Sequence, residues 1–487
     1  MAQTLEPFLF RLMISGPVSR QHTPRTAWGT LKSLIPYTYF TLGAVLMGIV
    51  GFLMLKVWPF HREKMKLAYH YLLKKVTGWI FPLSFSGKKK VLYDGESPFS
   101  KPAVIIANHQ SILDILATVS LTPKILLVTN EWVWKSPVFG YVARLAEYYP
   151  ITEGTTENIT QMKERIQQGY SILVFPEGTR SADGRLKRFH KGAFLMAQEL
   201  NLDILPLLIH GSGNLIPKGE LYVEVGTMTM KFLPRISPND SRFGTSYSER
   251  TKTISRYFKD ELAQFSRQLE TPTYFKRKLI SNYLFKGPLL EWYLRVKLRL
   301  EKNYEPFEQL VPREGEILDL GCGYGFLSYM LHFLSADRKI TGVDYDHDKI
   351  ETANNCYSKS DQIHFVSADI TQYVFSTYDC IILSDVLHYL RPESQLQLLE
   401  KSIRALKPQG KIIVREGVRD IGKRHFGTQV TEFFSVNLLR FNKSKNELSF
   451  LSKEDILAKA AEHHCDVEII DNAKLTSNLI FVIKRKK

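Results

Sequence analysis

Short apolar segments separated by polar helical stretches fill most of the chain, and they follow one long uncharged run near its start. The uncharged run covers residues 33–55. One set of alternating segments lies between residues 103 and 269, and a second begins at residue 316 and continues to the end of the chain. Alternation of this kind is typical of a sheet covered by helices. The pattern therefore predicts the α/β fold class, with an N-terminal helix followed by two α/β domains.

The individual elements follow from the period of each apolar segment. Short apolar runs bounded by turn-forming residues predict buried strands, and longer stretches with a helical period predict amphipathic helices. In the first set, strands are expected at 103–107, 125–129, 171–175 and 203–209. In the second set, strands are expected at 316–320, 339–343, 362–366, 379–383, 411–415, 466–470 and 478–484. The clearest helical patterns are at 160–168, 249–269, 347–357 and 393–406.

The uncharged run 33–55 is long enough to cross a bilayer core of about 30 Å. It is too long, and lies too far from the start, for an ordinary signal peptide. Pro36 and Gly43 within it are tolerated in membrane helices. Basic residues are denser after the run than before it, which predicts that the rest of the chain faces the cytoplasm from a bacterial inner membrane. A buried core helix and a shallow re-entrant segment remain as alternatives.

These features divide the chain into four parts. Residues 1–60 are expected to anchor it in the membrane, residues 61–270 and 311–487 to form the two α/β domains, and residues 271–310 to connect them. The connector contains several prolines and is rich in basic and aromatic side chains. This composition favours a surface helix that contacts the bilayer or the first domain. A solvated helix with one apolar face is an equally good interpretation.

Charge and cysteine content narrow the classes of partner. Lysine and arginine number 65 against 49 acidic residues, a net charge of +16. Such an excess indicates a polyanionic partner, either nucleic acid or an anionic membrane surface. Zinc-finger and RNA-binding signatures are absent from the sequence, so membrane lipids are expected and nucleic acid is not. The 4 cysteines include no Cys-x-x-Cys pair, which argues against a metal site and for a reducing compartment.

A first group of chemically active residues follows the strand expected at 103–107. Residues 108–114 read Asn-His-Gln-Ser-Ile-Leu-Asp. An alcohol that attacks a thioester must lose a proton, and a neutral imidazole oriented by a carboxylate can accept it. His109 and Asp114 supply these two groups if a helix starts between them. No side-chain nucleophile is then needed, because the acceptor hydroxyl attacks directly.

A second group follows the strand at 171–175 and reads Phe-Pro-Glu-Gly-Thr-Arg-Ser. Arg180 offers a planar fork suited to phosphate, and Gly178 permits close approach of the backbone to a ligand. Glu177 is a candidate to orient Arg180 or to bind an acceptor hydroxyl.

The two groups together resemble the glycerolipid acyltransferase family, which contains the 1-acylglycerol-3-phosphate acyltransferases. The resemblance covers roughly residues 60–270. It implies O-acyl transfer from an acyl-CoA or acyl-carrier-protein thioester, with His109 as base and Asp114 as its orienting partner. It also implies that the acceptor or its phosphate is bound by a set of five residues: Lys135, Glu177, Gly178, Thr179 and Arg180.

The sequence departs from the family at one place. Many members carry a basic residue in the second motif, whereas the corresponding stretch 147–152 reads Glu-Tyr-Tyr-Pro-Ile-Thr. One phosphate contact is therefore expected to be missing, and Lys187, Arg188 or Lys191 are candidates to replace it. The hypothesis follows that the acceptor is an amphiphilic alcohol other than lysophosphatidic acid.

The second domain opens with another ligand-binding pattern. Residues 317–325 read Ile-Leu-Asp-Leu-Gly-Cys-Gly-Tyr-Gly, and glycines at such a strand–helix turn permit close backbone approach. A dinucleotide fold requires Gly at position 326, where this chain has Phe. S-adenosylmethionine (SAM) has no pyrophosphate, and its ammonium group suits Asp319. Asp344, after the next strand, suits ribose hydroxyls, and Asp369 suits the adenine amino group.

These residues resemble class I SAM-dependent methyltransferases over about residues 310–487, and a seven-stranded Rossmann-like sheet is implied. The resemblance gives the cofactor site as Asp319, Gly321, Gly323, Gly325, Asp344, Asp369 and Ser384. The methyl acceptor is not evident from the sequence. His388, Arg415 and Glu416 are candidates to face it, and a structural histidine is an equally good interpretation of His388.

The sequence thus predicts a membrane-attached bifunctional transferase without a metal site. Its pairing of domains resembles acyltransferase–methyltransferase fusions of bacterial aryl-polyene (flexirubin-type) pathways. Three alternatives remain open. One is a glycerophospholipid enzyme that methylates a lipid headgroup, another is an acyltransferase regulated by SAM binding, and the third is a membrane-anchored nucleic-acid methyltransferase.

Overall fold

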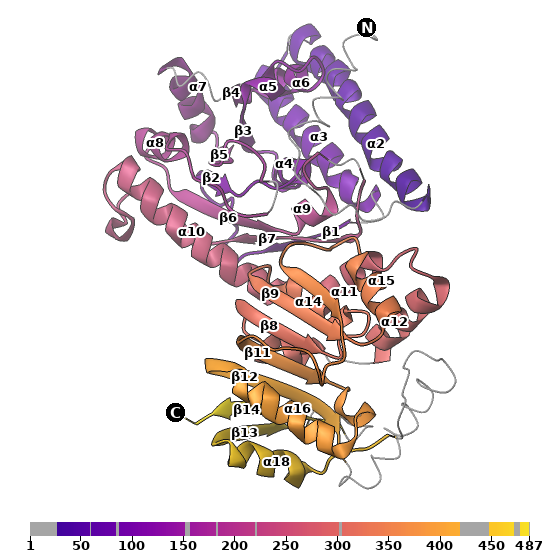
Figure 1. Ribbon diagram of the computed structural model, residues 1–487. Helices are drawn as coiled ribbons and strands as arrows, with labels where there is room; N and C mark the ends of the chain where they lie inside the picture. The colour runs from indigo at the N-terminus through magenta and orange to yellow at the C-terminus, as the bar shows by residue number, and fades with distance from the viewer. Residues whose placement is uncertain are drawn as a thin grey trace. The chain divides into compact units, whose positions relative to one another are not determined.

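The computed structural model describes residues 27–58, 60–83, 87–150, 156–181, 184–219, 222–300, 304–418, 448–471 and 478–486 (Figure 1). The described chain forms two compact units, one ending at Ser266 and the other beginning at Arg267. Each unit contains one seven-stranded sheet with helices. The expected α/β class, with an N-terminal apolar helix and a Rossmann-like second sheet of seven strands, is confirmed.

The first sheet has the order β1-β7-β6-β2-β5-β3-β4. Its neighbours are parallel except β6 and β7, which run antiparallel. The strands are β1 (Gly87–Leu92), β2 (Val104–Ala107), β3 (Ile125–Thr129), β4 (Tyr149–Pro150), β5 (Ser171–Val174), β6 (Ile204–His210) and β7 (Gly226–Phe232). The four expected strands are β2, β3, β5 and β6, whose side chains are all buried. Strand β1 escaped the sequence pattern because Lys88 and Lys90 alternate with half-buried residues at the edge of the sheet.

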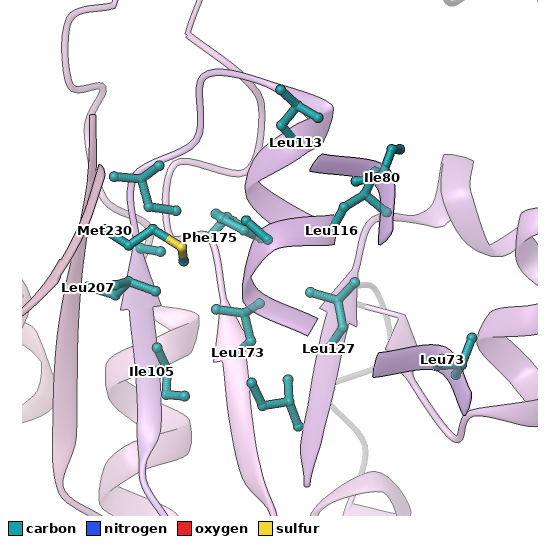
Figure 2. Close-up of a cluster of buried hydrophobic side chains, with 14 of the residues drawn as sticks. Leu73, Ile80, Ile105, Leu113, Leu116, Leu127, Leu173, Phe175, Leu207 and Met230 are labelled. Atoms are coloured by element: carbon teal, nitrogen blue, oxygen red, sulfur yellow. The ribbon is translucent and has the colours of Figure 1, made fainter. Parts of the chain in front are cut away.

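Helices cover both faces of this sheet (Figure 1). They are α2 (Ala27–Phe52), α3 (Arg62–Leu83), α4 (Ile112–Val119), α5 (Glu131–Trp134), α6 (Phe139–Leu145), α7 (Thr156–Gln167), α8 (Gly192–Glu199), α9 (Ser212–Leu215) and α10 (Tyr247–Leu269). Two short helices, η2 (Leu53–Val57) and η3 (Ser241–Phe243), complete the unit. Figure 2 shows how α3 and α4 close one face: Leu73, Ile80, Leu113 and Leu116 lie against the strand residues Ile105, Leu127, Leu173 and Leu207.

Helix α2 coincides with the expected apolar helix, and it is attached to the first unit along its length. The Val223 amide donates to the Ser33 hydroxyl at 2.9 Å near one end. The Tyr69 hydroxyl donates to the Met47 carbonyl at 3.2 Å near the other. A Cβ atom at Gly51 would lie 2.6 Å from the Tyr69 ring, so only glycine permits this close approach. One face of α2 is therefore buried against the α/β unit.

The opposite face of α2 is apolar and exposed. Its largest exposed side chains include Leu42, Leu46 and Ile49, which are 64%, 57% and 55% accessible. Within the described residues, the helix spanning residues 27–57 is the one that is long and apolar enough to cross a membrane. An exposed apolar helix face is typical of surfaces that contact a membrane or another protein.

The second sheet has the order β10-β9-β8-β11-β12-β14-β13. Its strands are β8 (Gly315–Leu320), β9 (Arg338–Asp344), β10 (Ile363–Ser367), β11 (Tyr378–Ser384), β12 (Leu406–Gly417), β13 (Cys465–Ile470) and β14 (Asn478–Arg485). The first five are parallel, and β14 pairs antiparallel with both β12 and β13. All seven expected strands are present. The parallel arrangement brings the carboxyl ends of β8, β9, β10 and β11 to one edge of the sheet.

The helices of the second unit include three in the segment 271–310, which the sequence presented as a surface connector. The helices are α11 (Pro272–Asn282), α12 (Pro288–Leu300), α13 (Tyr304–Leu310), α14 (Phe326–Leu334), α15 (His347–Asn354), η4 (Leu387–Tyr389), α16 (Pro392–Arg404) and α18 (Lys453–Glu462). Leu279, Tyr283 and Leu294 are fully buried in the same core as the residues of α14. Part of this segment therefore stabilises the second unit from within, whereas Phe285 and Trp292 are 67% and 50% exposed.

Candidate active sites

The loop between β2 and α4 holds the first candidate site. Ser111 is the N-cap of α4, and the Asp114 carboxylate reaches back to accept the Ser111 amide at 2.8 Å. This reciprocal arrangement is a capping box, and its Ser-x-x-Asp spacing explains why the helix starts here. The cap places His109 in the loop at the carboxyl end of β2, three residues before the first helical residue.

The imidazole and carboxylate of this loop lie in direct contact. His109 Nδ1 is 2.9 Å from Asp114 Oδ2, and the same oxygen accepts the Gln110 amide at 2.7 Å. Asp114 is fully buried, while the His109 side chain retains 12% exposure. One carboxylate oxygen thus contacts the imidazole and the amides of Gln110 and Ser111. The contact at Nδ1 assigns the proton to that nitrogen and leaves Nε2 as the acceptor.

Glu177 links the His109 loop to the chain after β5. Its Oε1 accepts the His109 amide at 2.7 Å and its Oε2 accepts the Lys187 amide at 2.8 Å. The side chain is 3% exposed, and burial raises the pKa of its carboxyl to about 7. The sequence suggested that Glu177 orients Arg180 or binds an acceptor hydroxyl. In the structure both of its oxygens instead accept backbone amide hydrogens, which fixes the two loops relative to each other.

A backbone hydrogen bond also holds the turn that contains Arg180 next to the His109 loop. The Ser181 amide donates to the His109 carbonyl at 2.7 Å. The ammonium groups of Lys187 and Lys218 donate to the Arg180 carbonyl at 3.1 and 3.3 Å. Gly178 has a φ of +68°, which only glycine adopts without strain. His109, Arg180 and two lysines thus meet beside one loop.

Two members of this cluster differ in how well the sequence indicated them. Lys187 is one of the candidates to replace the missing basic residue, whereas neither sequence motif contains Lys218. It lies in a Pro-Lys-Gly turn after α9, and that turn signal is the feature that could have identified it. Thr179 is exposed in the same turn as Arg180.

Lys135 lies apart from these contacts. It is the C-cap residue of α5, its side chain is 72% exposed, and its ammonium pairs with Glu131 of the same helix. The structure therefore brings His109, Asp114, Glu177 and Arg180 together, whereas the Lys135 side chain does not join their hydrogen-bonded network.

The stretch 147–152, in which the family carries a basic residue, begins with Glu147, and this residue forms ion pairs. Glu147 accepts from Arg165 Nε at 2.7 Å and from Lys66 Nζ at 2.6 Å. Arg165 also pairs with Glu63 of α3, so this network connects α3 with α7. The last two residues of this stretch, 151 and 152, lie outside the described part of the chain.

The second candidate site starts at the turn between β8 and α14. All three of its glycines have positive φ angles: +74° at Gly321, +54° at Gly323 and +76° at Gly325. A Cβ atom at Gly321 would lie 2.3 Å from Val386, and one at Gly325 would lie 2.5 Å from the Phe365 ring. At Gly323 the nearest heavy atom would be 4.0 Å away. The outer glycines are required for packing, and Gly323 leaves its backbone open to a ligand.

Two carboxylates flank this turn at the sheet edge. Asp319 is 2% exposed and accepts the Ser328 hydroxyl at 2.5 Å. Burial, with a smaller effect of the Asp344 charge, raises the pKa of Asp319 to about 7. Asp344 accepts the amides of Gly323 and Asp346, each at 2.9 Å. A carboxylate can accept further hydrogen bonds beyond these two, so Asp344 retains capacity for ribose hydroxyls.

The remaining two predicted cofactor residues follow the next strands. Asp369 comes two residues after β10, is exposed, and accepts the Thr371 amide at 2.9 Å. Ser384 ends β11 and donates to the Asp385 carboxylate at 3.3 Å. Since β8, β9, β10 and β11 are parallel neighbours, all four predicted positions lie at the same edge. The open glycine turn, flanked by carboxylates, fits a ligand with an ammonium group and a ribose.

Comparisons with known proteins give separate matches for the two units. Residues 87–210 match the family model described as Acyltransferase, and residues 317–410 match the model described as Methyltransferase domain. A 1-acyl-sn-glycerol-3-phosphate acyltransferase of Limnanthes douglasii is 29% identical over 216 residues, which are 43% of this chain and 74% of that protein. A chloroplastic enzyme of the same name from Arabidopsis thaliana is 33% identical over 122 residues, covering 24% of this chain and 34% of its own.

Solved structures are similar to each unit at lower sequence identity. The 1-acyl-sn-glycerophosphate acyltransferase of Thermotoga maritima is 24% identical with a TM-score of 0.42, covering 49% of this chain and 96% of its own. Human N-acetylserotonin methyltransferase, solved with SAM, is 20% identical with a TM-score of 0.33, covering 52% of this chain and 76% of its own.

The fold and the two loops define the chain as a fusion of two transferases. Its first unit carries an acyltransferase domain of the glycerolipid type. Its second unit carries a class I SAM-dependent methyltransferase domain. The expected fusion of these two enzymes is confirmed.

Glu177→Gln tests the link between the two acyltransferase loops. An amide has one acceptor oxygen, so the amide hydrogen of either His109 or Lys187 loses its partner and the base shifts. Because displacement by about 1 Å can cost on the order of 100-fold in rate, we expect CoA release from a long-chain acyl-CoA to slow at least ~10-fold. Glu199→Gln, at an exposed position of α8, is the control. An unchanged rate in Glu177→Gln would contradict the role of the link.

Asp319→Asn tests the raised pKa in the methyltransferase unit. The carboxyl titrates near 7 in the folded chain, against an ordinary value of 3.8. Its contribution to stability is therefore fully present below 3.8 and is lost as the pH rises through about 7. We expect the change in unfolding temperature between about pH 5 and about pH 8 to be smaller in Asp319→Asn than in the wild type. Asp361→Asn, at an exposed position, should retain the wild-type dependence, and equal slopes in all three proteins would refute the assignment.

Proposed function

We propose that the chain transfers a fatty acyl group from an acyl-CoA or acyl-carrier-protein thioester to the hydroxyl of a lysophospholipid-like acceptor. We also propose that it methylates a small or lipid-like acceptor with SAM. The acyl-transfer proposal rests chiefly on one observation, the His109–Asp114 contact in a loop that Glu177 and the Arg180 turn hold in place. The relatives' printed names supply the class of acceptor.

The chemistry of acyl transfer follows from the protonation of this pair. Asp114 holds the proton of His109 on Nδ1, so Nε2 accepts the proton of the acceptor hydroxyl as its oxygen attacks the thioester carbonyl. The buried carboxylate stabilises the imidazolium that forms. The imidazolium then returns the proton to the departing thiolate, which leaves an ester and a free thiol.

The cations beside His109 support an acceptor that carries a phosphate. Lys187 and Lys218 converge on the backbone of Arg180, and lysine and arginine are the residues that bind phosphate oxygens. These two lysines compensate for the basic residue that the second motif lacks. We therefore favour a phosphate-bearing lysolipid over a neutral alcohol as the acceptor.

In the second unit, we propose that the turn of Gly321, Gly323 and Gly325 binds SAM. Asp319 pairs with its ammonium group, Asp344 with its ribose, and Asp369 and Ser384 line the adenine end. The bound sulfonium supplies an electrophilic methyl group. The contribution of the protein is alignment of the acceptor with that methyl group and exclusion of water.

Membrane association is proposed to occur through the exposed face of α2, with the catalytic units on the cytoplasmic side of a bacterial inner membrane. Contacts from Ser33 to Gly51 attach α2 to the first unit along most of its length. A helix attached in this way is better suited to lie in one leaflet than to cross the bilayer alone. Membrane lipids are then both partner and source of substrate, and an aryl-polyene lipid is one candidate product.

Paired variants test whether the two activities are independent. His109→Ala removes the proposed base, so acyl transfer to lysophosphatidic acid should fall at least ~100-fold, while calorimetric SAM affinity should be unchanged. Asp344→Ala should weaken SAM binding and leave acyl transfer intact. Each variant serves as the control for the other. Acyl transfer that survives in His109→Ala would remove the base assignment.

Introducing negative charge on the exposed face of α2 tests whether that face contacts the membrane. Leu42→Asp combined with Leu46→Asp adds charge at two positions that are 64% and 57% exposed, so folding should be retained. We expect this double variant to stop sedimenting with phosphatidylglycerol–phosphatidylethanolamine vesicles, because a charge at the acyl boundary costs several kcal/mol. Leu195→Asp on α8, at a position 40% exposed, is the matched control. Equal sedimentation of all three proteins would exclude α2 as the membrane face.

A further inference from the structure

Helix α12 of the methyltransferase unit has an apolar face in the core and further apolar side chains that are exposed. Its buried residues are Leu290, Leu294 and Leu298, spaced four apart in the core of the second unit. Trp292 lies two positions from both Leu290 and Leu294, about 200° around the helix axis, and it is 50% exposed. Leu289, three residues before Trp292 and therefore beside it on the helix surface, is 54% exposed.

The loop before α12 adds a third exposed apolar side chain and holds it in place. Phe285 is 67% exposed, and its φ is +62°, an uncommon conformation for a bulky residue. Such a conformation persists only where surrounding contacts determine it. The contact here is with Glu291 of α12, whose carboxylate accepts the Phe285 amide at 2.8 Å. The fold therefore holds an exposed aromatic residue close to the turn of α12 that carries Trp292.

Positive charge follows these apolar residues along the helix. Arg295 and Arg299, three and seven residues after Trp292, are both exposed and continue its side of α12. Glu291 is the sole acidic residue between positions 272 and 300. The exposed side of α12 is therefore apolar at its start and basic toward its end.

An anionic lipid surface is complementary to this arrangement. Single exposed apolar residues are common on folded proteins, but large ones grouped at one helix turn mark a surface of interaction. Tryptophan and phenylalanine bind at the boundary between lipid headgroups and acyl chains. Guanidinium groups pair with lipid phosphates, and a net charge of +16 attracts the whole chain to an anionic leaflet. Apolar contact and charge thus favour the same partner.

We propose that Phe285, Leu289, Trp292, Arg295 and Arg299 form a surface that binds the methyltransferase unit to an anionic bilayer. We call these five residues the α12 surface. The proposal rests on the membrane association proposed above for α2 and extends it to the second unit. Because the α12 surface is small, we expect it to dock a chain that α2 already holds at the membrane, rather than to bind vesicles alone.

The α12 surface begins close to the proposed SAM turn. Tyr283, two residues before Phe285, donates from its hydroxyl to the Tyr324 carbonyl of that turn at 2.6 Å. The ring of Tyr293 in α12 lies 6.2 Å from the ring of Phe326, the first residue of α14. Contact of Phe285 with a bilayer would therefore bring lipid next to elements that support the cofactor turn, which suits a lipid-like methyl acceptor.

A fluorophore at position 289 tests the contact in the full-length chain. Leu289→Cys introduces a thiol at a position 54% exposed, and a nitrobenzoxadiazole label on it emits more strongly and at shorter wavelength among lipid acyl chains. We expect both changes when phosphatidylglycerol–phosphatidylethanolamine vesicles are added. His364→Cys, at an exposed position of β10, carries the same label as the control and should not respond. The unsubstituted chain, treated with the same reagent, gives the contribution of its own 4 cysteines.

Sedimentation of the same samples separates the ways in which the proposal can fail. A silent label at position 289 on a chain that sediments with vesicles would overturn the α12 surface and leave α2 as the membrane face. A chain that does not sediment would overturn both proposals. Emission that is already shifted before vesicles are added, or that shifts with protein concentration alone, would show that protein covers this face and would overturn the lipid partner.

Neutral variants of the two arginines test the choice of an anionic lipid. Each basic residue near an anionic leaflet favours binding by a factor of about five. In Arg295→Gln combined with Arg299→Gln, the ratio of docked to undocked label at saturating vesicles should therefore fall at least ~5-fold. Lys252→Gln combined with Lys259→Gln, at exposed positions of α10, removes the same charge and should retain the response. Equal losses in the two double variants, or an equal response of the wild-type surface to phosphatidylcholine vesicles, would overturn the anionic partner.

Discussion

Carboxylates fixed by backbone amides are the interaction on which both candidate sites depend. A buried carboxylate loses its hydration, and the donors that replace water determine whether it stays ionised. At Asp114, protein groups replace the lost water at Oδ2, which contacts two backbone amides and the His109 ring. The same carboxylate also caps α4. One side chain thus starts a helix, orients an imidazole and balances the charge that forms there, so the site cannot assemble unless the local fold is correct.

Glu177 and Asp319 are the contrasting cases, in which burial outweighs hydrogen bonding. Burial raises the pKa of each to about 7, although Glu177 accepts two amides and Asp319 one hydroxyl. Both carboxyls thus stabilise the folded chain less as the pH rises through neutrality. For Asp319 the proposed ligand supplies the missing compensation, since an ammonium group favours the ionised form. Glu177 has no such ligand. Burial of its carboxyl is unfavourable, and the fold tolerates this because the carboxyl holds the His109 loop.

The parts of each site that the sequence predicted are those encoded by neighbouring residues. The His109–Asp114 contact lies within one loop and the first turn of one helix, and the glycine turn lies between one strand and one helix, so local sequence motifs indicate both. The roles of Glu177 and Lys218 depend on contacts between loops far apart in the chain, which no local pattern specifies. For the same reason the strands predicted well were the fully buried ones, such as β2 and β6. The edge strand β1 was missed because its lysines carry no apolar signal.

The segment 271–310 combines buried residues with exposed apolar ones, which its composition alone does not distinguish. Its basic and aromatic residues suit a membrane surface, yet Tyr283 is fully buried and donates to the Tyr324 carbonyl at 2.6 Å. Tyr324 belongs to the glycine turn of the methyltransferase site. Tyr283, the residue that follows α11, therefore supports that turn. The two helices differ in their packing: α2 leaves Leu42 and Leu46 more than half exposed, whereas α11 packs its apolar residues into the core that contains α14. Membrane association is accordingly better judged from the face that remains uncovered after folding than from the residues a helix contains.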